Sequence, residues 1–349
     1  MQLELYPGPP RPISCGNAFI GAHLINYLDL ALANLGSPLI LAFALGLFAS
    51  LARSDLSIPE AAAKFLSIYL LFAIGFKGGV SVSLHGIDLA LGTSLIAGIF
   101  LSAALPIIAF GMLRVMTKLD RTNAAAVAGH YGSISIVTFV AATSVLESLG
   151  MESEGYMVAV AAAMEAPAIL SALWLISTGS KSEACMDATL WREIMLNGSI
   201  VLLVGAFIIG MVTGPEGLKE VEAFIVAPFK GVLCLFLLDM GLIAGRGLRE
   251  SRGIISLGLV AFGVLMPIVG SLVGVVVGMV LGLSTGGVFL FMVLSASASY
   301  IAVPAAMRVA VPEANPSVYL TLSLGITFPF NLTLGLPLYL GLATALTGG

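Results

Sequence analysis

The sequence predicts an all-α polytopic membrane protein in which ten transmembrane helices form two inverted repeats of five, with helices 4 and 9 broken. Three observations support this fold class: the composition, a series of internal echoes about 164 positions apart, and two polar interruptions deep inside apolar spans. The 349 residues are 59% hydrophobic and only 10% charged, whereas about a quarter of the residues in a soluble domain are charged. Most of the chain is therefore expected to lie in a membrane.

Ten stretches of the chain are apolar and close to the length of about 20 residues that a helix needs to cross a bilayer. Five fall in a first repeat at 37–178 and five in a second repeat at 194–349. A short cytoplasmic linker at 179–193 joins the repeats, and an N-terminal extracytoplasmic segment at 1–36 precedes them. The expected spans are 37–53, 58–76, 90–114, 122–149, 154–178, 194–214, 219–245, 253–283, 286–310 and 316–346.

The two halves repeat short motifs at a nearly constant offset. Three sets of matches recur in chain order, 162 to 166 positions apart, and each falls in equivalent spans of the two halves. Because each half has an odd number of spans, the second half must cross the membrane in the opposite sense. The matches are Ala42-Phe43 and Gly46 with Ala206-Phe207 and Gly210, Gly75 and Gly79 with Gly241 and Gly245, and Pro167 with Pro329.

Basic residues are divided unevenly between the two sides of the predicted membrane domain. Cytoplasmic loops carry an excess of Lys and Arg, and ten basic residues fall on one side against three on the other. This bias places the linker in the cytoplasm and both termini outside an inner (plasma) membrane. The ten are Arg53, Arg114, Lys118, Arg121, Lys181, Arg192, Arg246, Arg249, Arg252 and Arg308, and the three are Arg11, Lys77 and Lys219.

Polar segments interrupt the fourth and ninth spans at 129–135 and 295–304. Gly and Ser weaken a helix, and Pro304 cannot continue one from upstream. In lipid, the freed backbone groups need partners from protein, water or a ligand. Ser133 lies 12 residues beyond Arg121, or about 18 Å along a helix, which is near the bilayer midplane. Paired interruptions at matching places are typical of the binding site of a secondary transporter.

The two interruptions supply the candidate site. New helix N-termini beyond each break would offer unpaired N–H groups to an anion, and unwound carbonyls beside them suit a sodium ion. The alternative is that these small residues only allow close helix packing and that each Ser bonds to its own helix. The candidate substrate-binding residues are Gly132, Ser133, Ser135, Thr138, Ser297, Ser299, Tyr300 and Ala302, and the candidate ion-binding residues are Glu165, Ser135, Ser299 and Thr327.

Glu165 is the carboxylate that the sequence places nearest the middle of these spans. It lies two residues before Pro167 and 16 residues before Lys181. Ionisable residues inside the membrane are costly and are usually functional. Glu165 either helps to hold a cation, or it is a hydrogen-bonded strut that packs against span 4.

Several classes of function are excluded by missing motifs. The chain has no phosphate-binding loop and no His-Glu-x-x-His pair, so it is not expected to be an enzyme or to need a cofactor. Its net charge of −4, without a basic patch, argues against nucleic acid. The three cysteines lie far apart, which implies neither a disulfide framework nor a metal cluster. Transport would be driven by an ion gradient or be passive.

The chain resembles the sodium-dependent bicarbonate transporter superfamily over roughly residues 37–346. The resemblance implies ten helices in two inverted repeats, a core and a gate domain, a homotrimer, and uptake of bicarbonate with sodium as the coupling ion. The motifs that carry it are Gly75-Phe76-Lys77-Gly78-Gly79, Tyr131-Gly132 with Ser135 and Thr138, Glu165-Ala166-Pro167, and Pro304 with Arg308, Val311-Pro312, Ala314-Asn315-Pro316-Ser317 and Tyr319.

The chain departs from the cyanobacterial members of that family at the proposed site. It has Ile136-Val137 between Ser135 and Thr138 where they have Gly-Ser, and Tyr300 where they have Asp. The predicted function is therefore sodium-dependent symport of bicarbonate or a similar small monovalent anion. The alternatives are another small organic anion, or a membrane sensor or assembly subunit that does not transport. The short linker at 179–193 argues against docking of the family's PII-like regulatory partner.

Overall fold

A computed structural model describes residues 36–86, 88–177, 198–250, 256–300 and 311–348, together with residues 192, 196, 303, 304, 306 and 307. Nearly all of the predicted N-terminal segment, most of the predicted linker at 179–193, and Ala302 lie outside the described residues. The described part is all-helical, with no strand, as the sequence predicts.

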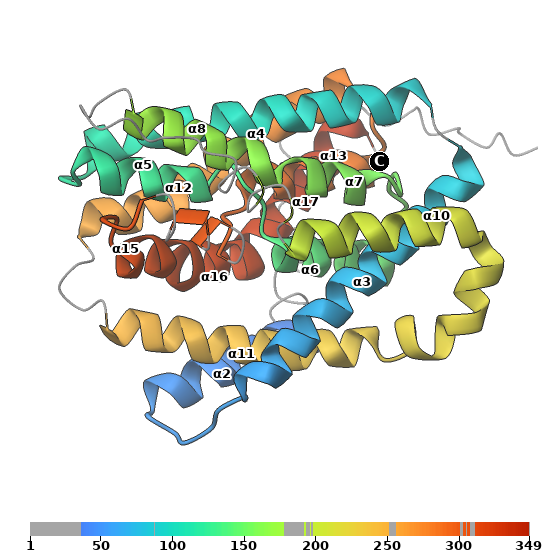
Figure 1. Cartoon of the computed structure of the whole chain (residues 1–349), viewed down its shortest axis with the longest axis horizontal. Coiled ribbons are helices and arrows are strands. Elements are labelled where there is room, and N and C mark those ends of the chain that lie inside the picture. Colours follow the sequence, from blue (N-terminus) through green and yellow to red (C-terminus); the bar gives the residue numbers. More distant parts are fainter. Residues whose placement is uncertain are drawn as a thin grey trace, which may run out of the picture.

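The first half of the chain contains the helices from α2 to α8, and the second half contains those from α10 to α17 (Figure 1). Span 4 is divided into two helices, and span 9 ends its first helix early. The first-half helices are α2 Pro38–Leu51, α3 Glu60–His85, α4 Leu89–Met116, α5 Arg121–His130, α6 Ile136–Leu149, α7 Met157–Ala163 and α8 Glu165–Ser177. The second half contains α10 Gly198–Ile225, α11 Phe229–Glu250, α12 Leu257–Val280, α13 Thr285–Ala296, α15 Pro316–Leu320, η1 Thr321–Thr327, α16 Phe328–Phe330, η2 Asn331–Gly335 and α17 Leu336–Thr347.

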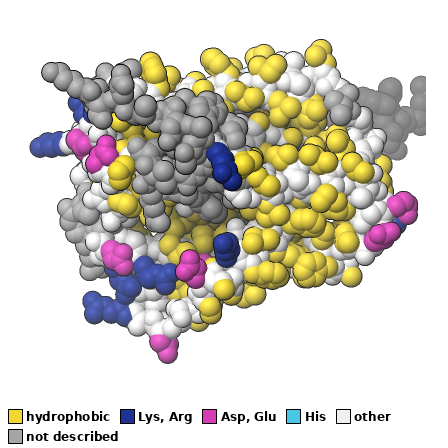
Figure 2. Space-filling view, in the orientation of Figure 1, with side chains coloured by type: hydrophobic (Ala, Val, Ile, Leu, Met, Phe, Trp, Pro, Cys, Tyr) yellow, Lys and Arg dark blue, Asp and Glu magenta, His cyan; other side chains and the backbone are white. Residues whose placement is uncertain are grey.

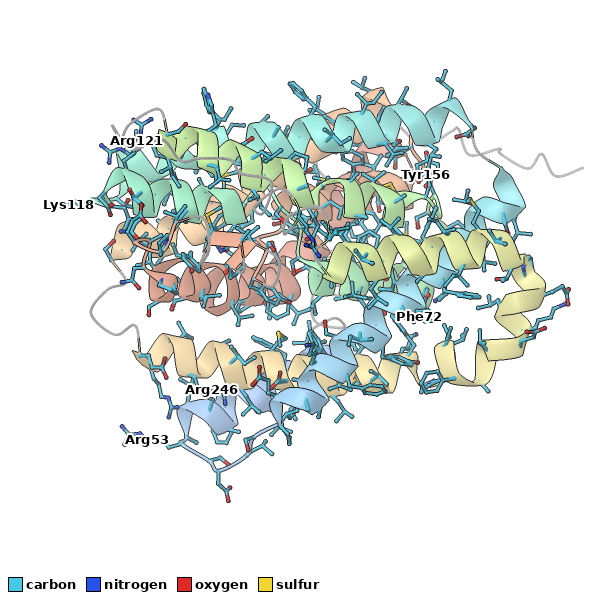
Figure 3. All side chains as sticks on the ribbon, viewed as in Figure 1. Arg53, Phe72, Lys118, Arg121, Tyr156 and Arg246 are labelled. Carbon is cyan, nitrogen blue, oxygen red and sulfur yellow. The ribbon has the colours of Figure 1, made fainter. Side chains whose placement is uncertain are left out.

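Seven helices in the described part are long and apolar enough to cross a membrane, and α2, α6 and α13 are shorter apolar helices. The breaks in spans 4 and 9 are one physical reason that fewer than ten elements reach full length. The face in Figure 2 is largely hydrophobic, with most of its acidic side chains toward the two ends. The labelled basic residues Arg53, Lys118, Arg121 and Arg246 all lie toward the left end in Figure 3. These features describe a multi-pass membrane protein.

Two boundaries differ from the sequence-based spans. Helix α3 continues to His85, nine residues past the expected end at 76. Helix α10 runs to Ile225 across a kink at Gly214, where φ is 60° and the next residue is Pro215. Glycine tolerates a positive φ without steric cost, so the chain bends there and the helical backbone resumes. The kink thus joins two segments that the composition had separated.

Helices α2, α3, α10 and α11 form a four-helix group that packs against a central group made by the other helices (Figure 1). Backbones in the four-helix group touch at glycines. A Cβ atom at Gly46 of α2 would lie 2.0 Å from the Leu238 carbonyl oxygen of α11, and one at Gly79 of α3 would lie 1.9 Å from that of Phe207 on α10. Small residues at such crossings let membrane helices approach closely. The repeated glycines therefore define the two closest helix pairs, α2 with α11 and α3 with α10.

Candidate functional site

The first break separates α5 from α6 at residues 131–135. Gly132 lies against α4, because a Cβ atom there would be only 2.4 Å from the Pro106 ring. Helix α6 restarts behind Ser135, whose Oγ accepts hydrogen bonds from the Thr138 N–H at 3.2 Å and from the Thr138 hydroxyl at 2.9 Å. The predicted interruption is thus present, and Ser135 acts as the N-cap of the second half-helix.

The second break follows α13, with residues 297–300 non-helical and the helical backbone present again at 303 and 304. The end of α13 is held by Asn331, whose Nδ2 donates to the Ala296 carbonyl at 2.8 Å. The Tyr339 hydroxyl in turn donates to Asn331 Oδ1 at 2.8 Å. Asn331 was not among the residues predicted from the sequence, although an Asn inside an apolar run is a signal, because such a group needs hydrogen-bond partners when buried.

The two breaks touch. The Ser299 N–H donates to the His130 carbonyl oxygen at 2.7 Å, so a backbone group freed by one interruption is satisfied by the other. His130 is fixed on both sides: its Nδ1 lies 2.7 Å from the Ala126 carbonyl oxygen, and its ring stacks on Tyr319 with centroids 4.5 Å apart. The backbones of the two interruptions are therefore in contact, and the His130 ring is held by a carbonyl of its own helix.

A small cavity of about 10 Å³ lies at this crossing. A cavity needs about 10–15 Å³ to hold one water, so the space suits a single water-sized occupant. Four of the sequence-predicted residues line it: Ser135 and Ser299 from the breaks, Tyr300, and Glu165 from the start of α8. The remaining walls are the apolar residues Leu71, Ile134 and Ile136.

Buried polar atoms without partners gather around the crossing. Glu165 is 5% exposed, and its Oε2 has no hydrogen-bond partner. The Oγ atom of Ser133 also has no partner, and the Tyr300 hydroxyl lies near the Ser135 side chain. Buried polar groups in folded proteins are almost always hydrogen-bonded, and exceptions call for an explanation such as a bound ion or water. The donor and acceptor set around the cavity therefore fits a small polar ligand.

Ser102 on α4 supports the kink between α7 and α8. Its hydroxyl donates to the Met164 carbonyl, and its Oγ accepts from the Ala168 N–H at 3.1 Å. Met164 interrupts α7 and α8, and Pro167 lacks an N–H, so backbone groups at this kink need a side-chain partner. With Ser102 holding the kink, the Glu165 side chain is left facing the cavity.

Three other predicted residues are placed next to the cavity lining rather than in it. Thr138 bonds Ser135, and the Ser297 hydroxyl donates to Val293 of its own helix at 2.6 Å. Thr327 donates to the Gly263 carbonyl at 2.7 Å and lies 2.7 Å from the Tyr131 hydroxyl. Since a carbonyl can only accept, Tyr131 is the donor to Thr327. The Thr327 hydroxyl thus positions Tyr131, whose ring meets Phe262 edge-on.

Two π-helical segments, η1 and η2, flank this region and carry Thr327 and Asn331. Such segments are rare and often occur at functional sites. Among the residues that the structure describes, no three or more His, Cys, Asp or Glu side chains gather as metal ligands. An ion at the crossing would be held by hydroxyl and carbonyl oxygens together with one carboxylate.

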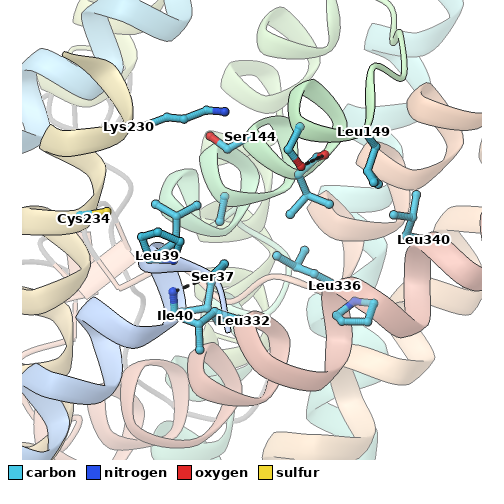
Figure 4. Close-up of a pocket in the computed structure, with 15 residues that line it drawn as sticks. Ser37, Leu39, Ile40, Ser144, Leu149, Lys230, Cys234, Leu332, Leu336 and Leu340 are labelled. Atoms are coloured by element: carbon cyan, nitrogen blue, oxygen red, sulfur yellow. Dashed lines mark hydrogen bonds between the residues drawn. The ribbon is translucent and has the colours of Figure 1, made fainter. Parts of the chain in front are cut away.

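A separate apolar cavity of about 270 Å³ lies between the two helix groups, on another face of α6 (Figure 4). Its walls come from α2, α6, α11, η2 and α17, and Figure 4 shows Lys230 of α11 extending toward Ser144 of α6. The other lining residues are mostly leucine and proline side chains. We call this space the Lys230 cavity. None of its lining residues belongs to the small cavity at the crossing.

Apolar helices, two of them interrupted so that their breaks meet inside the bundle, define a class: multi-pass membrane proteins with the crossing found in secondary transporters. The chain belongs to the Na⁺-dependent bicarbonate transporter superfamily, whose sequence pattern matches residues 38–344. The resemblance seen in the sequence is therefore confirmed, and this membership fits transport rather than enzyme chemistry. A comparison with curated proteins found no match.

Proposed function

We propose that this protein is a sodium-dependent symporter of bicarbonate or a similar small monovalent anion, which binds where the two broken helices cross. The observation that carries the proposal is the backbone contact between Ser299 and His130, at 2.7 Å, beside a cavity lined by Ser135, Tyr300 and Glu165. Membership of a Na⁺-dependent bicarbonate transporter superfamily supports the ion and the substrate class.

The anion is proposed to bind at the N-terminal end of α6. The first N–H groups of a helix lack intrahelical acceptors, and the helix dipole adds a partial positive charge. Ser135 lies at this end as the cap, the Ser133 hydroxyl has no partner, and Tyr300 lines the same cavity as Ser135. These groups can donate hydrogen bonds to anion oxygens. In this proposal Gly132, Ser297, Ala302 and Thr138 shape or support the site.

Sodium is proposed to bind next to the anion, with Glu165 as its charged ligand and the oxygens of Ser135 and Ser299 beside it. A buried carboxylate is costly unless it is paired with a cation, and Glu165 Oε2 has no partner in the fold. A sodium ion would supply that charge, and the anion would compensate the positive helix end. Both binding events would then favour each other, which is what coupled transport requires. Thr327 contributes through Tyr131.

The packing of the four-helix group supports the inverted-repeat part of the proposal. A two-fold operation that exchanges the halves maps α2 onto α10 and α3 onto α11. It therefore maps the α2–α11 pair onto the α10–α3 pair, and both pairs meet at the repeated glycines: Gly241 against Phe43, and Gly210 against Phe76. The ten-span topology with both termini extracytoplasmic, and the homotrimer implied by family resemblance, remain predictions.

A different organic anion is the second candidate, favoured by the apolar lining of the crossing. Leu71, Ile134 and Ile136 contribute three of the seven residues around the small cavity. These side chains cannot hydrogen-bond a third oxygen, but they can contact a methyl or methylene group. A small monocarboxylate would therefore use the same helix end through its two oxygens.

Uptake by the purified protein in proteoliposomes tests the proposal. Radiolabelled bicarbonate uptake should require an inward sodium gradient and should be absent from protein-free liposomes. Acetate and lactate are included as labelled substrates, so that preference for a carboxylate over bicarbonate identifies the second candidate. Uptake of none of these anions, from protein that is folded and inserted, would contradict transport and favour a sensor or assembly role.

A further inference from the structure

A second cavity, of about 240 Å³, lies on the other side of α6 from the Lys230 cavity and is bounded by α3, α6, α7, α11 and α13. Three charged residues line it: Lys77 of α3, Glu147 of α6 and Glu154 of the loop before α7. Glu154 binds the N-cap residue of α13, because its Oε1 accepts the Ser284 N–H at 2.6 Å and its Oε2 accepts the Ser284 hydroxyl at 3.1 Å. The other two charged residues, Lys77 and Glu147, face each other in this space. We call it the Lys77 cavity.

The Lys77 cavity shares no lining residue with the small cavity at the crossing, but it lies beyond that cavity along the faces of two helices. On α3, Leu71 lines the small cavity, and Ile74, Lys77 and Ser81 line the larger one. Residues three or four apart lie on one face of a helix, so these four form a single stripe. On α6, Ile136 lines the small cavity and Phe139 and Thr143 follow it into the larger one. Lys77 lies about 9 Å along α3 from Leu71 at 1.5 Å per residue.

Lys77 joins the two helix groups at this cavity. Its ammonium forms an ion pair with Glu147, across from the four-helix group to the central group. The same ammonium lies 5.4 Å from the centroid of the Phe229 ring of α11. Among the described residues, this is the one ion pair that connects the groups; the other, Lys219 with Glu216, lies within α10.

The pair is held loosely enough to exchange. The Lys77 and Glu147 side chains are 31% and 42% exposed, and ion pairs at such positions contribute little net stability. An ammonium that binds a carboxylate can bind bicarbonate or another small carboxylate in the same way, through a charge-assisted hydrogen bond. Substrate can therefore replace Glu147 on Lys77, and the displaced Glu147 carboxylate, whose side chain is 42% exposed, can be solvated by water.

We propose that Lys77 is an outer binding site for the transported anion, closed at rest by Glu147, on the access route from the Lys77 cavity to the crossing. The proposal rests on the proposed function and adds the route and the residue that controls it. When the anion binds the Lys77 ammonium, the ion pair between the helix groups breaks. The Glu147 carboxylate can then attract a sodium ion to the Lys77 cavity.

The Lys230 cavity is the natural comparison. It also carries one lysine between the two helix groups, but its lining is apolar and includes no acidic residue. It shares no lining residue with either the Lys77 cavity or the crossing. Lys230→Gln is thus a matched control for Lys77→Gln, and Lys219→Gln controls for loss of an ion pair that stays within one helix.

Uptake kinetics separate an anion site from a merely structural ion pair. Lys77→Gln should raise the KM for the anion about fivefold, a factor expected from losing one half-exposed charge contact of about 1 kcal/mol. Glu147→Gln should lower that KM, since it removes the group that competes for Lys77. Lys230→Gln and Lys219→Gln should leave KM unchanged. Shifts of the same sign in the first two variants, or a larger shift in Lys230→Gln, would overturn the proposal.

A labelling experiment tests the route without relying on transport. Thr143→Cys, in a background whose native cysteines are replaced by serine, places a thiol in the Lys77 cavity. This position is one helical turn before Glu147 in α6. A membrane-impermeant thiol reagent should label it faster when Glu147→Gln is added, and saturating bicarbonate should slow labelling only while Lys77 is present. The charge-swapped pair Lys77→Glu with Glu147→Lys should restore slow labelling. A labelling rate that changes with neither Lys77 nor Glu147 would refute the route, even if uptake is normal. The expected changes in labelling rate, found in a protein that shows no uptake, would support the Lys77 site and contradict the proposed transport function.

Discussion

Replacing Glu165 by Gln removes the one carboxylate that lines the crossing while keeping its size and its capacity to hydrogen-bond. Glu165 is 5% exposed and its Oε2 has no partner, so loss of its charge breaks no hydrogen bond of that atom. If Glu165 balances sodium, the change should weaken sodium binding more than anion binding. If it is a strut, the change should have almost no effect.

The expected size follows from Coulomb's law. A carboxylate and a sodium ion about 4 Å apart attract each other by about 4 kcal/mol at an effective dielectric constant of 20. Part of that attraction is offset by the cost of burying the carboxylate in the absence of the ion. A remaining difference of at least about 1.4 kcal/mol corresponds to a tenfold rise in the sodium concentration that gives half-maximal uptake. The anion KM at saturating sodium should change less than threefold.

The assay measures anion uptake into proteoliposomes as a function of sodium concentration, for wild type and Glu165→Gln. Asp239→Asn is the matched control, because Asp239 is a second buried carboxylate with an unpartnered oxygen, on α11 and outside the small cavity. Its sodium curve should match that of wild type. Superimposable curves for wild type and Glu165→Gln would refute the ion-balancing role, and equal shifts in both variants would show a general effect of buried charge.

Four further substitutions and one control test the site and the helix packing around it. Ser135→Leu and Ser299→Leu each place a bulky apolar group in the small cavity, so uptake should vanish while the detergent-solubilised protein elutes as a folded species; normal uptake by both would locate the site elsewhere. Asn331→Ala leaves the Ala296 carbonyl and the Tyr339 hydroxyl without their partner, which should lower stability by about 1–3 kcal/mol in a thermal unfolding assay. Gly79→Val would force α3 away from α10 and should cost about 1–3 kcal/mol or more, whereas Gly92→Ala, where no atom lies within 4 Å of the added methyl, should be silent.

Local chemistry made the interruptions predictable. Gly, Ser and Pro weaken helices through short-range effects on the backbone, so residues 132–135 could be assigned as non-helical from composition alone. The interruptions supplied Ser135, Ser299 and Tyr300, and the cost of a charge inside the membrane singled out Glu165; the fold brings these four residues to one cavity. The repeated glycines were likewise visible as a pattern, because close helix contacts leave a mark in the sequence.

Partnerships across the fold were beyond the sequence. Nothing local to Asn331 indicates that its amide reaches the end of α13, and nothing local to Thr327 assigns it to Tyr131 rather than to an ion. Lys77 was counted only as a charge on one side of the membrane, yet it pairs with Glu147, 70 positions away.

By itself, then, the sequence determined the class of fold, its membrane setting, the two breaks and the residue types placed in them. The tertiary structure decided which polar groups are used up by partners and which face the cavity. The reason is that helix propensity acts over a few residues, whereas a hydrogen bond forms only with a group that tertiary packing brings within about 3 Å. Ser102 supports the kink and Glu165 faces the crossing because α4 packs against α8, a choice made between segments more than 60 positions apart.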